Sequence, residues 1–276
     1  MIGHRGTPGH LPEHALESYR LAIRMGADAV ETDVVMSSDG VLVVRHENEL
    51  SRTTDVSTRA EFTARRTVRQ IDGQRVEGWF SEDFTFAELR TLGAPTVLDP
   101  IISLDELLLL VAEESARAGR RIGLHIEVKH PTYFAAAGLP MVQPLLQTLR
   151  DHGVERADSR VWIQSFDEEF VRRISPLTPL PLVQLVEEDT RIDCHAIAGY
   201  ADAIGPNRTM VLNAGGVVLP LLAQAHRAGL QVFVWTMRGS VAEHRELFAT
   251  GVDGVFTDYA DRGVAALART VVGEPA

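Results

Sequence analysis

The chain has 276 residues, of which 45% are hydrophobic and 24% charged, and its formal net charge is -11. This is typical of a globular protein with one large domain or two small ones, and no apolar run approaches the ~20 residues that a membrane-spanning helix needs. The acidic excess argues against a nucleic-acid partner, because such binding depends on clustered Lys and Arg.

Short apolar runs alternate with longer helix-period stretches along the chain, which is the pattern of a parallel α/β fold. Nine runs are candidate strands: Met1–His4, Ala29–Val35, Val41–His46, Ile122–Val128, Arg160–Phe166, Leu180–Val186, Ala203–Asn207, Gln231–Thr236 and Val252–Thr257. Parallel strands need a crossover of a dozen or more residues, yet only Met36–Gly40 separates the second run from the third. Those two runs should therefore form an antiparallel hairpin that turns at Ser38-Asp39-Gly40, which leaves eight parallel strands.

The stretches between the strands predict helices that end before glycines. The clearest are Ala15–Met25, Leu104–Ala118 with Ser103 as its N-cap, and Val217–Ala228. Eight strand-and-helix units in about 250 residues have the size and rhythm of a TIM (β/α)8 barrel. We predict this fold, as a single domain, for residues 1–276.

Residues 47–100 interrupt this alternation. The segment is polar, rich in Arg and Thr, and contains the aromatic residues Trp79, Phe80, Phe84 and Phe86. Because it is longer than a plain loop, we predict a small subdomain inserted between the second and third barrel strands, over the barrel mouth.

Carboxylates gather at the carboxyl ends of the predicted strands, where TIM barrels have their active sites. Glu31 and Asp33 share one face of the second strand because they are two residues apart, and Glu127 lies near the end of the next barrel strand. Three carboxylates in a small space require a cation, and oxygen-only ligands favour Ca²⁺ or Mg²⁺. The alternative is pairing with Arg5, Lys129 or helix N-termini and no metal. We favour the metal because the carboxylates outnumber these two cations.

Two histidines flank this cluster, His4 after the first strand and His46 at the end of the hairpin's return arm. Taken singly, each of them would more often be structural, since the chain contains ten histidines. As a pair at one barrel mouth, however, they suit a general acid and a general base. Arg5 and Lys129 add positive charge suited to a phosphate. Lys129 is the single lysine among 27 basic residues. A GC-rich genome explains the arginine bias, and a salt bridge to Glu127 is the alternative role for this lysine.

Other features carry weaker signals. Trp235, near the end of the seventh strand, either contacts substrate or packs in the core. Gly215-Gly216 before a helix could bind an anion, but such a pair more often only leads into the helix. Four histidines close to site elements are interpreted as structural or supporting before catalytic: His10, His14, His125 and His130.

In chain order, these residues resemble the glycerophosphodiester phosphodiesterase family of phospholipase C-like TIM barrels. The similarity covers nearly the whole chain, through His4-Arg5-Gly6, Pro12-Glu13, Gly26-Ala27-Asp28, Glu31-x-Asp33, Asp39-Gly40 leading to His46, Glu127-x-Lys129, Gln164-Ser165-Phe166, Trp235-Thr236 and Gly254-Val255-Phe256-Thr257-Asp258. The combination is highly specific, although His-Arg-Gly alone is not. Arg52-Thr53-Thr54 and residues 78–85 are similar to the insertion of the glycerophosphodiester-specific subgroup, whose bacterial members are often exported.

The resemblance implies metal-dependent hydrolysis of glycerophosphodiesters to sn-glycerol 3-phosphate and an alcohol. The roles that it implies are acid/base catalysis by His4 and His46, phosphate contact by Arg5 and Lys129, and ligation of one Ca²⁺ or Mg²⁺ by Glu31, Asp33 and Glu127. Three positions depart from the commonest family pattern: His14-Ala15 in place of Asn-Thr, Glu47 in place of Asp, and Arg238 in place of Asn. These departures bear on substrate preference more than on activity.

Two other functions are compatible with the same barrel. A lipid-directed phosphodiesterase, acting on lysophospholipids or polymeric glycerol phosphate, should present exposed apolar residues near the mouth, whereas residues 47–100 are mostly polar. An inactive glycerophosphodiester-binding barrel would not need both histidines and three carboxylates.

The cysteine content and the N-terminus add two expectations. The single cysteine, Cys194, excludes an internal disulfide and a zinc site built on paired cysteines. The chain opens without a basic and apolar leader, so we predict no signal peptide within it. Compartment, oligomeric state and the released alcohol are left open by the sequence.

Overall fold

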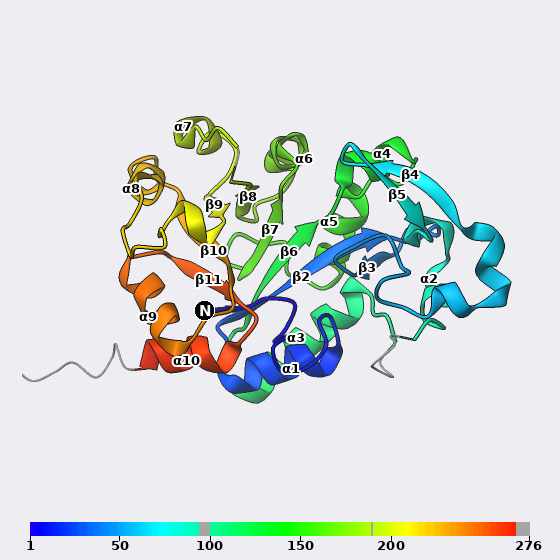
Figure 1. The fold of residues 1–276 in the computed structure, drawn as a ribbon, viewed down its shortest axis with the longest axis horizontal. Coiled ribbons are helices and arrows are strands. Elements are labelled where there is room, and N and C mark those ends of the chain that lie inside the picture. Colours follow the sequence, from blue (N-terminus) through cyan, green and yellow to red (C-terminus); the bar gives the residue numbers. More distant parts are fainter. Residues whose placement is uncertain (94–99, 189, 269–276) are drawn as a thin grey trace, which may run out of the picture.

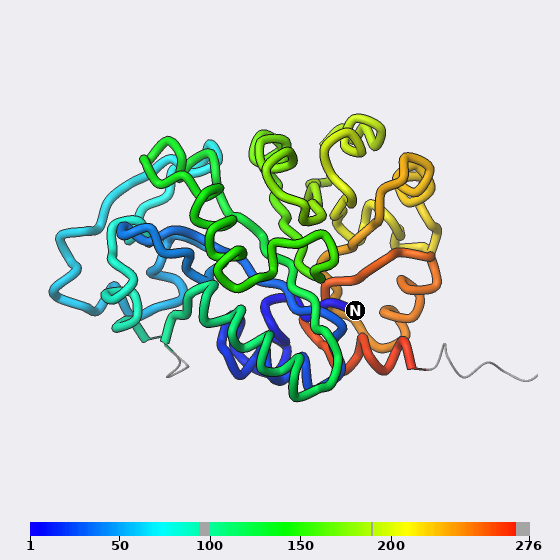
Figure 2. The backbone as a smooth tube through the Cα atoms, turned by 180° about the vertical axis from the view of Figure 1, so that it is seen from behind, coloured from blue at the N-terminus to red at the C-terminus, as the bar shows by residue number. Residues whose placement is uncertain are grey.

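A closed barrel of parallel strands surrounded by helices forms the centre of the protein (Figure 1). The computed structural model describes residues 1–93, 100–188 and 190–268. In these ranges the eight barrel strands are β1 (Ile2–Gly3), β2 (Ala29–Met36), β6 (Gly123–Val128), β7 (Val161–Ser165), β8 (Leu182–Val186), β9 (Ala203–Pro206), β10 (Gln231–Met237) and β11 (Gly254–Thr257). β1 pairs with both β2 and β11, so the first and last strands lie side by side and close the sheet (Figure 2). The predicted TIM barrel is confirmed.

β3 (Leu42–Val44) is the added antiparallel strand that the short connection after β2 requires. It pairs with the end of β2 in the register Val35↔Val43. The predicted hairpin is therefore confirmed, and it brings the chain that follows β3 back to the mouth of the barrel.

Helices and short 3-10 turns connect the barrel strands. They are α1 (Leu16–Met25), α3 (Leu104–Ala118), α4 (Pro131–Ala136), α5 (Val142–Asp151), α6 (Glu168–Ile174), η4 (Ser175–Leu177), α7 (Cys194–Ile197), η5 (Arg208–Met210), α8 (Pro220–Arg227), α9 (Val241–Ala249) and α10 (Ala260–Ala268). Ser103 caps α3 as predicted, and its side chain accepts a hydrogen bond from the backbone N–H of Glu106. No helix in the described ranges combines the length and apolar character needed to cross a membrane.

The start predicted for the helix at Val217 is wrong by three residues. Val218 instead forms an antiparallel bridge with Leu212, and Pro220 occupies the first position of α8. Proline is favoured at this position because the first helical N–H has no partner inside the helix.

Two apolar layers hold the barrel together. The larger layer lies between strands and helices and includes Leu104, Leu107 and Val111 of α3. The smaller layer fills the barrel interior with Ile2, Ala29, Val183, Leu185, Ala203, Phe233 and Phe256, and the rings of Trp162, Phe166 and Trp235 pack against it. Side chains that point into the barrel beyond this apolar layer therefore lie at the barrel mouth.

The inserted segment, cyan in Figure 1, projects to one side of the barrel beside β3. Its elements are η1 (Val56–Thr58), η2 (Ala60–Arg65), β4 (Thr67–Ile71), β5 (Gln74–Gly78), η3 (Ser81–Asp83) and α2 (Phe86–Leu89). Trp79 and Phe84 belong to the same apolar layer as the barrel helices. At the tip of the β4–β5 hairpin, Asp72 Oδ2 lies 2.6 Å from Nδ1 of His130. Residues 94–99, at the end of the predicted insertion, lie outside the described residues.

His125 is a buried histidine of the barrel interior, in line with the structural role expected for it. Its ring stacks on Trp162 and meets Phe233 and Phe256 edge-on. Burial lowers the pKa of His125 to about 3. The folded protein therefore resists protonation of this ring down to a pH at which the unfolded chain is already protonated.

Replacement of this histidine should reduce the acid sensitivity of the fold. In the unfolded chain His125 takes up a proton near pH ~6.5, so between that pH and about pH 3 it lowers the free energy of unfolding as the pH falls. At pH 5 this effect lowers the free energy of unfolding by about 2 kcal/mol. Urea unfolding at pH 7 and pH 5 should therefore show a smaller pH effect for His125→Gln than for wild type, and no such change for the exposed His195→Gln. An equal pH effect in His125→Gln and wild type would contradict this account.

Candidate active site

Three buried carboxylates form the floor of the mouth. Glu31 and Asp33 project from one face of β2, and Glu127 of β6 is the register partner of Asp33. One oxygen of each carboxylate lies within 4.8 Å of the others. The structure thus brings together all three residues that the sequence indicates as metal ligands.

The donor set in this cluster fits a divalent cation. Both carboxylate oxygens of Asp33 are buried and make no hydrogen bond. Nε of Arg5 and Nε2 of His14 lie 3.0 and 3.2 Å from Asp33 Oδ2, at ion-pair distance but without hydrogen-bond alignment. Because buried oxygens need a partner, their unused lone pairs are well suited to a hard, oxygen-binding ion such as Ca²⁺ or Mg²⁺.

The charges of the cluster are strongly coupled. Burial and the neighbouring carboxylates raise the pKa of Glu31 well above its usual range, and burial also raises that of Glu127. Burial alone would raise the pKa of Asp33 too, but contact with His14 and the charges of Arg5 and Lys129 hold it well below its usual range. Burial and mutual repulsion therefore oppose the ionised forms of Glu31 and Glu127, and positive charge in the cluster favours them.

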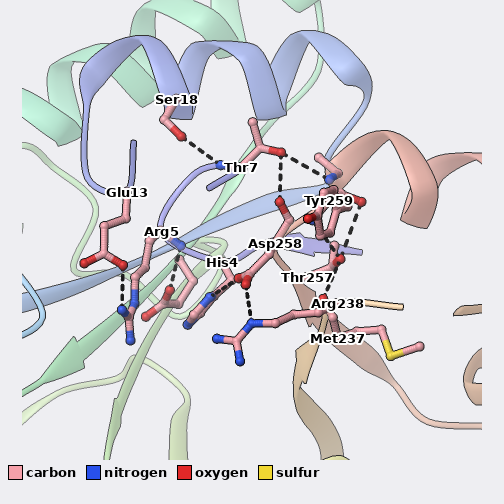
Figure 3. Close-up of polar contacts among 12 residues, drawn as sticks. His4, Arg5, Thr7, Glu13, Ser18, Met237, Arg238, Thr257, Asp258 and Tyr259 are labelled. Atoms are coloured by element: carbon pink, nitrogen blue, oxygen red, sulfur yellow. Dashed lines mark hydrogen bonds and ion pairs between the residues drawn. The ribbon is translucent and has the colours of Figure 1, made fainter. Parts of the chain in front are cut away.

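His4 is held by a carboxylate (Figure 3) and lines a cavity at the mouth of the barrel. It follows β1, and its Nδ1 lies 2.6 Å from Asp258 Oδ1. The other oxygen of Asp258 accepts a hydrogen bond of 2.5 Å from Nε of Arg238. Burial lowers the pKa of His4 although Asp258 opposes this effect. A neutral His4 that donates through Nδ1 to Asp258 keeps the lone pair on Nε2 for chemistry.

His46 lies across the carboxylate floor in a similar setting. Its Nδ1 is 2.8 Å from Glu47 Oε1, and this contact lowers the pKa of Glu47 to about 2. Lys129 Nζ is 3.3 Å from His46 Nε2 and 2.8 Å from Glu127 Oε1. Although burial opposes it, the charges of the nearby carboxylates raise the pKa of Lys129, so the lysine remains protonated.

Arg5 is brought over the cluster by a tight turn. Its own φ is 50°, and Gly6 follows with φ 92°, where a Cβ atom would lie 2.6 Å from Ser18 Oγ. Glycine is therefore required at this position. The Arg5 guanidinium donates to Glu13 Oε2 at 2.7 Å, and its backbone N–H donates to Glu31 Oε2 at 2.9 Å (Figure 3).

A cavity of about 900 Å³ opens above these groups. Its lining contains His4, Arg5, Glu31, His46, Glu127, Lys129 and Trp235, whereas Asp33 lies beneath them, fully buried. Trp235 donates through Nε1 to the carbonyl of Gly205 at 2.7 Å and meets the ring of Phe166 edge-on. It therefore packs against the barrel interior and also lines the cavity, while its contact with substrate stays a prediction.

Sequence reasoning did not assign three carboxylates that contact His4, Arg5 and His46. Asp258 contacts His4, Glu13 contacts Arg5, and Glu47 contacts His46. The sequence position of Asp258 could have indicated a role in the site, because this residue directly follows β11 at the same end of the barrel as the other site residues. Of the histidines considered supporting, His14 contacts Asp33 directly.

Comparison with known proteins places the chain among phosphodiesterases. The profile of the "Glycerophosphoryl diester phosphodiesterase family" matches residues 4–262. The chain is 31% identical to a glycerophosphodiester phosphodiesterase of Bacillus subtilis and 30% identical to one of Arabidopsis thaliana, in each case over 94% of this chain and 83% of the relative.

Two solved structures have a similar fold. A Silicibacter pomeroyi structure described as a putative glycerophosphoryl diester phosphodiesterase has a TM-score of 0.74 and 27% identity, over 99% of this chain and 94% of that chain. An Oleispira antarctica phosphodiesterase, solved in complex with the product sn-glycerol-3-phosphate, has a TM-score of 0.76 and 22% identity, over 97% and 96%. Both support the barrel architecture described above.

Proposed function

We propose, from the premise that the chain belongs to the glycerophosphoryl diester phosphodiesterase family, that it cleaves glycerophosphodiesters with two histidines and one divalent cation. Family membership makes the chain a phosphoric diester hydrolase. The products proposed are sn-glycerol 3-phosphate and an alcohol. The observation that carries the proposal is the convergence of His4, His46 and the three-carboxylate floor on one cavity.

Arg5 and Lys129 would hold the substrate phosphate between the two histidines. Both cations line the cavity, and carboxylates beside each of them raise its pKa, so both stay charged. Fixed positive charge next to the phosphate stabilises the negative charge that builds up on its oxygens during reaction. Trp235 offers an apolar wall for the carbon skeleton of the substrate.

The two histidines would move the protons. A new P–O bond forms to the attacking oxygen while the P–O bond to the alcohol breaks. One histidine removes the proton from the attacking oxygen, and the other donates a proton to the departing alcohol oxygen. The carboxylates of Asp258 and Glu47 hold the Nδ1 atoms of His4 and His46, which orients each ring for this exchange.

Glu31, Asp33 and Glu127 would hold the cation. A bound Ca²⁺ or Mg²⁺ supplies positive charge that polarises a phosphoryl oxygen. The buried oxygens of Asp33, which make no hydrogen bond, support this assignment.

We also propose that residues 1–276 form one domain with residues 47–100 as a subdomain over the mouth. Asp72 and Gln74 at the hairpin tip line the central cavity, and the contact between Asp72 and His130 holds the tip there. Of the large hydrophobic side chains that are exposed in the described ranges, one, Val68, belongs to this insertion. One such residue is little for a lipid-binding rim, so a small-molecule diester is the favoured substrate.

Lys129→Arg should strongly reduce activity although it keeps the charge. The ammonium group contacts Glu127 and His46 in a space that suits a compact cation, and the planar guanidinium fork does not reproduce both contacts. We expect kcat/KM for release of glycerol 3-phosphate from glycerophosphocholine to fall roughly 10–100-fold, with an unchanged melting temperature. Wild-type kinetics in this variant would remove Lys129 from the proposed site.

A further inference from the structure

A second cavity, of about 650 Å³, adjoins the central one. Its walls are residues 8–15, residues 44–47, residues 52–54 and the pair Pro100 and Ile101. His46 lines both cavities. A phosphate held beside His46 is therefore at the junction of two spaces, each large enough for one half of a diester.

Arg45, in the wall of the second cavity, is a buried cation without an acidic partner. Its side chain is 8% exposed. It donates to two neutral oxygens, the backbone carbonyl of Glu47 at 3.4 Å and the hydroxyl of Thr53. In the described ranges no carboxylate oxygen lies within ion-pair distance of it. Burial lowers the pKa of Arg45 to about 10, although the charges of Glu13, Glu49 and Glu47 oppose this effect.

The carboxylates nearest to this guanidinium are already engaged. Glu13 accepts from Arg5 at 2.7 Å, and Glu47 binds His46 at 2.8 Å. Glu49 accepts from two backbone N–H groups of its own segment. Because a buried charge is unfavourable unless it is paired, the cavity is left with a cation that an incoming anion would satisfy.

Arg52 adds a second cation to the same wall. Its side chain lines the cavity and, in the part of the chain that the structure describes, forms no ion pair. The hydroxyl-bearing residues Thr53 and Thr54 follow it in the lining. Two guanidinium groups in one cavity wall match the donors that phosphates and carboxylates prefer.

We propose that this second cavity binds an anionic group, phosphate or carboxylate, carried by the alcohol half of the diester. The inference rests on the proposed function, because it places the scissile phosphate beside His46. With that phosphate at the junction, the glycerol 3-phosphate half occupies the central cavity, and the alcohol half extends past His46 toward Arg45 and Arg52. The enzyme then prefers diesters whose alcohol bears a second negative charge.

Two diesters that differ in one phosphate test this preference. The probes are sn-glycero-3-phosphoglycerol and the same compound with a terminal phosphate on the second glycerol. Wild type should show a kcat/KM at least about tenfold higher for the phosphorylated diester. Arg45→Gln and Arg52→Gln should each lose most of this preference while their kcat/KM for the neutral diester stays within about threefold of wild type.

The exposed Arg66→Gln, in the insertion but outside the cavity lining, is the matched control and should keep the preference. Arg52→Gln also guards against misfolding, since its side chain is exposed, whereas Arg45 is buried. Equal kcat/KM for the two diesters in wild type, or equal losses on both diesters in the two variants, would overturn the inference.

Inorganic phosphate separates a free anion from one carried by the substrate. If phosphate changes neutral-diester turnover in wild type but not in Arg52→Gln, and wild type does not prefer the phosphorylated diester, the cavity binds a free anion only and the proposal is overturned. The preference for the phosphorylated diester, with or without a phosphate effect, supports it. If neither diester is hydrolysed, the proposed function itself fails. If both are hydrolysed without preference, the proposed function stands and only this inference fails.

Discussion

Alanine in place of either His4 or His46 should reduce kcat for glycerophosphodiester hydrolysis by ~10²–10⁴-fold. Each variant lacks one of the two groups that exchange protons with the attacking and departing oxygens. Substrate binding should change much less, because Arg5 and Lys129 remain in the cavity lining. His226→Ala is the matched control, since His226 also binds an aspartate but does not line the central cavity.

Asp258→Asn extends this test to the group that orients His4. The amide can donate to Nδ1 and so favours the wrong tautomer of the ring. We expect kcat to fall by about 10²-fold with little change in KM. Because Asp258 acts through His4, the double variant His4→Ala/Asp258→Asn should be no slower than His4→Ala alone. Independent, multiplying losses would show that Asp258 does not act through this histidine, and wild-type turnover in His4→Ala would remove His4 from the mechanism.

Removal of one floor carboxylate should abolish cation binding. Asp33→Asn keeps the shape of the side chain but removes the charge of the residue whose oxygens have no hydrogen-bond partner. Since even residues behind a metal ligand affect affinity by 10–100-fold, we expect a loss of at least about 100-fold in Ca²⁺ or Mg²⁺ affinity and comparable loss of turnover. Glu31→Gln and Glu127→Gln should behave in the same way.

Isothermal titration of the metal-free protein with each ion measures this effect. Wild type should bind one equivalent of the preferred ion. The control is Glu114→Gln, which removes a buried carboxylate paired with Arg24 on the outside of the barrel and should leave ion binding intact. Unchanged affinity in Asp33→Asn would exclude the floor as the metal site.

The strands and the carboxylate floor could be predicted from sequence because both follow from local periodicity. Strand β2 is otherwise largely apolar, and its two charged residues, Glu31 and Asp33, share one face. Once the barrel closes, parallel register places Glu127 beside Asp33. The short link to β3 likewise left no choice but a hairpin that returns His46 to the mouth.

The partners of the site residues could not be predicted in the same way. Asp258 is 254 residues from His4 in the chain and meets it only because β11 pairs with β1. Long-range side-chain contacts of this kind depend on rotamers, which periodicity does not encode. The contact between Asp72 of the insertion and His130 is of the same kind.

Two local features were present in the sequence but not used. The Asp72-Gly73 pair between β4 and β5 is a strong signal for a tight hairpin, and the insertion contains one there. Pro220 marks the first turn of α8, although the helical pattern was extended back to Val217. The buried Arg45 gave no signal, because its guanidinium contacts, to Glu47 and Thr53, depend on how the chain folds back after β3.

The central claim, hydrolysis by a cation held on the carboxylate floor, is tested most directly by product release. Glycerol 3-phosphate is measured after incubation with glycerophosphocholine, first as purified, then after EDTA, and then after Ca²⁺ or Mg²⁺ is added back. The account predicts product that is lost on chelation and restored by one of the two ions. Product formation that persists at full rate in EDTA, or no product with either ion, would contradict it.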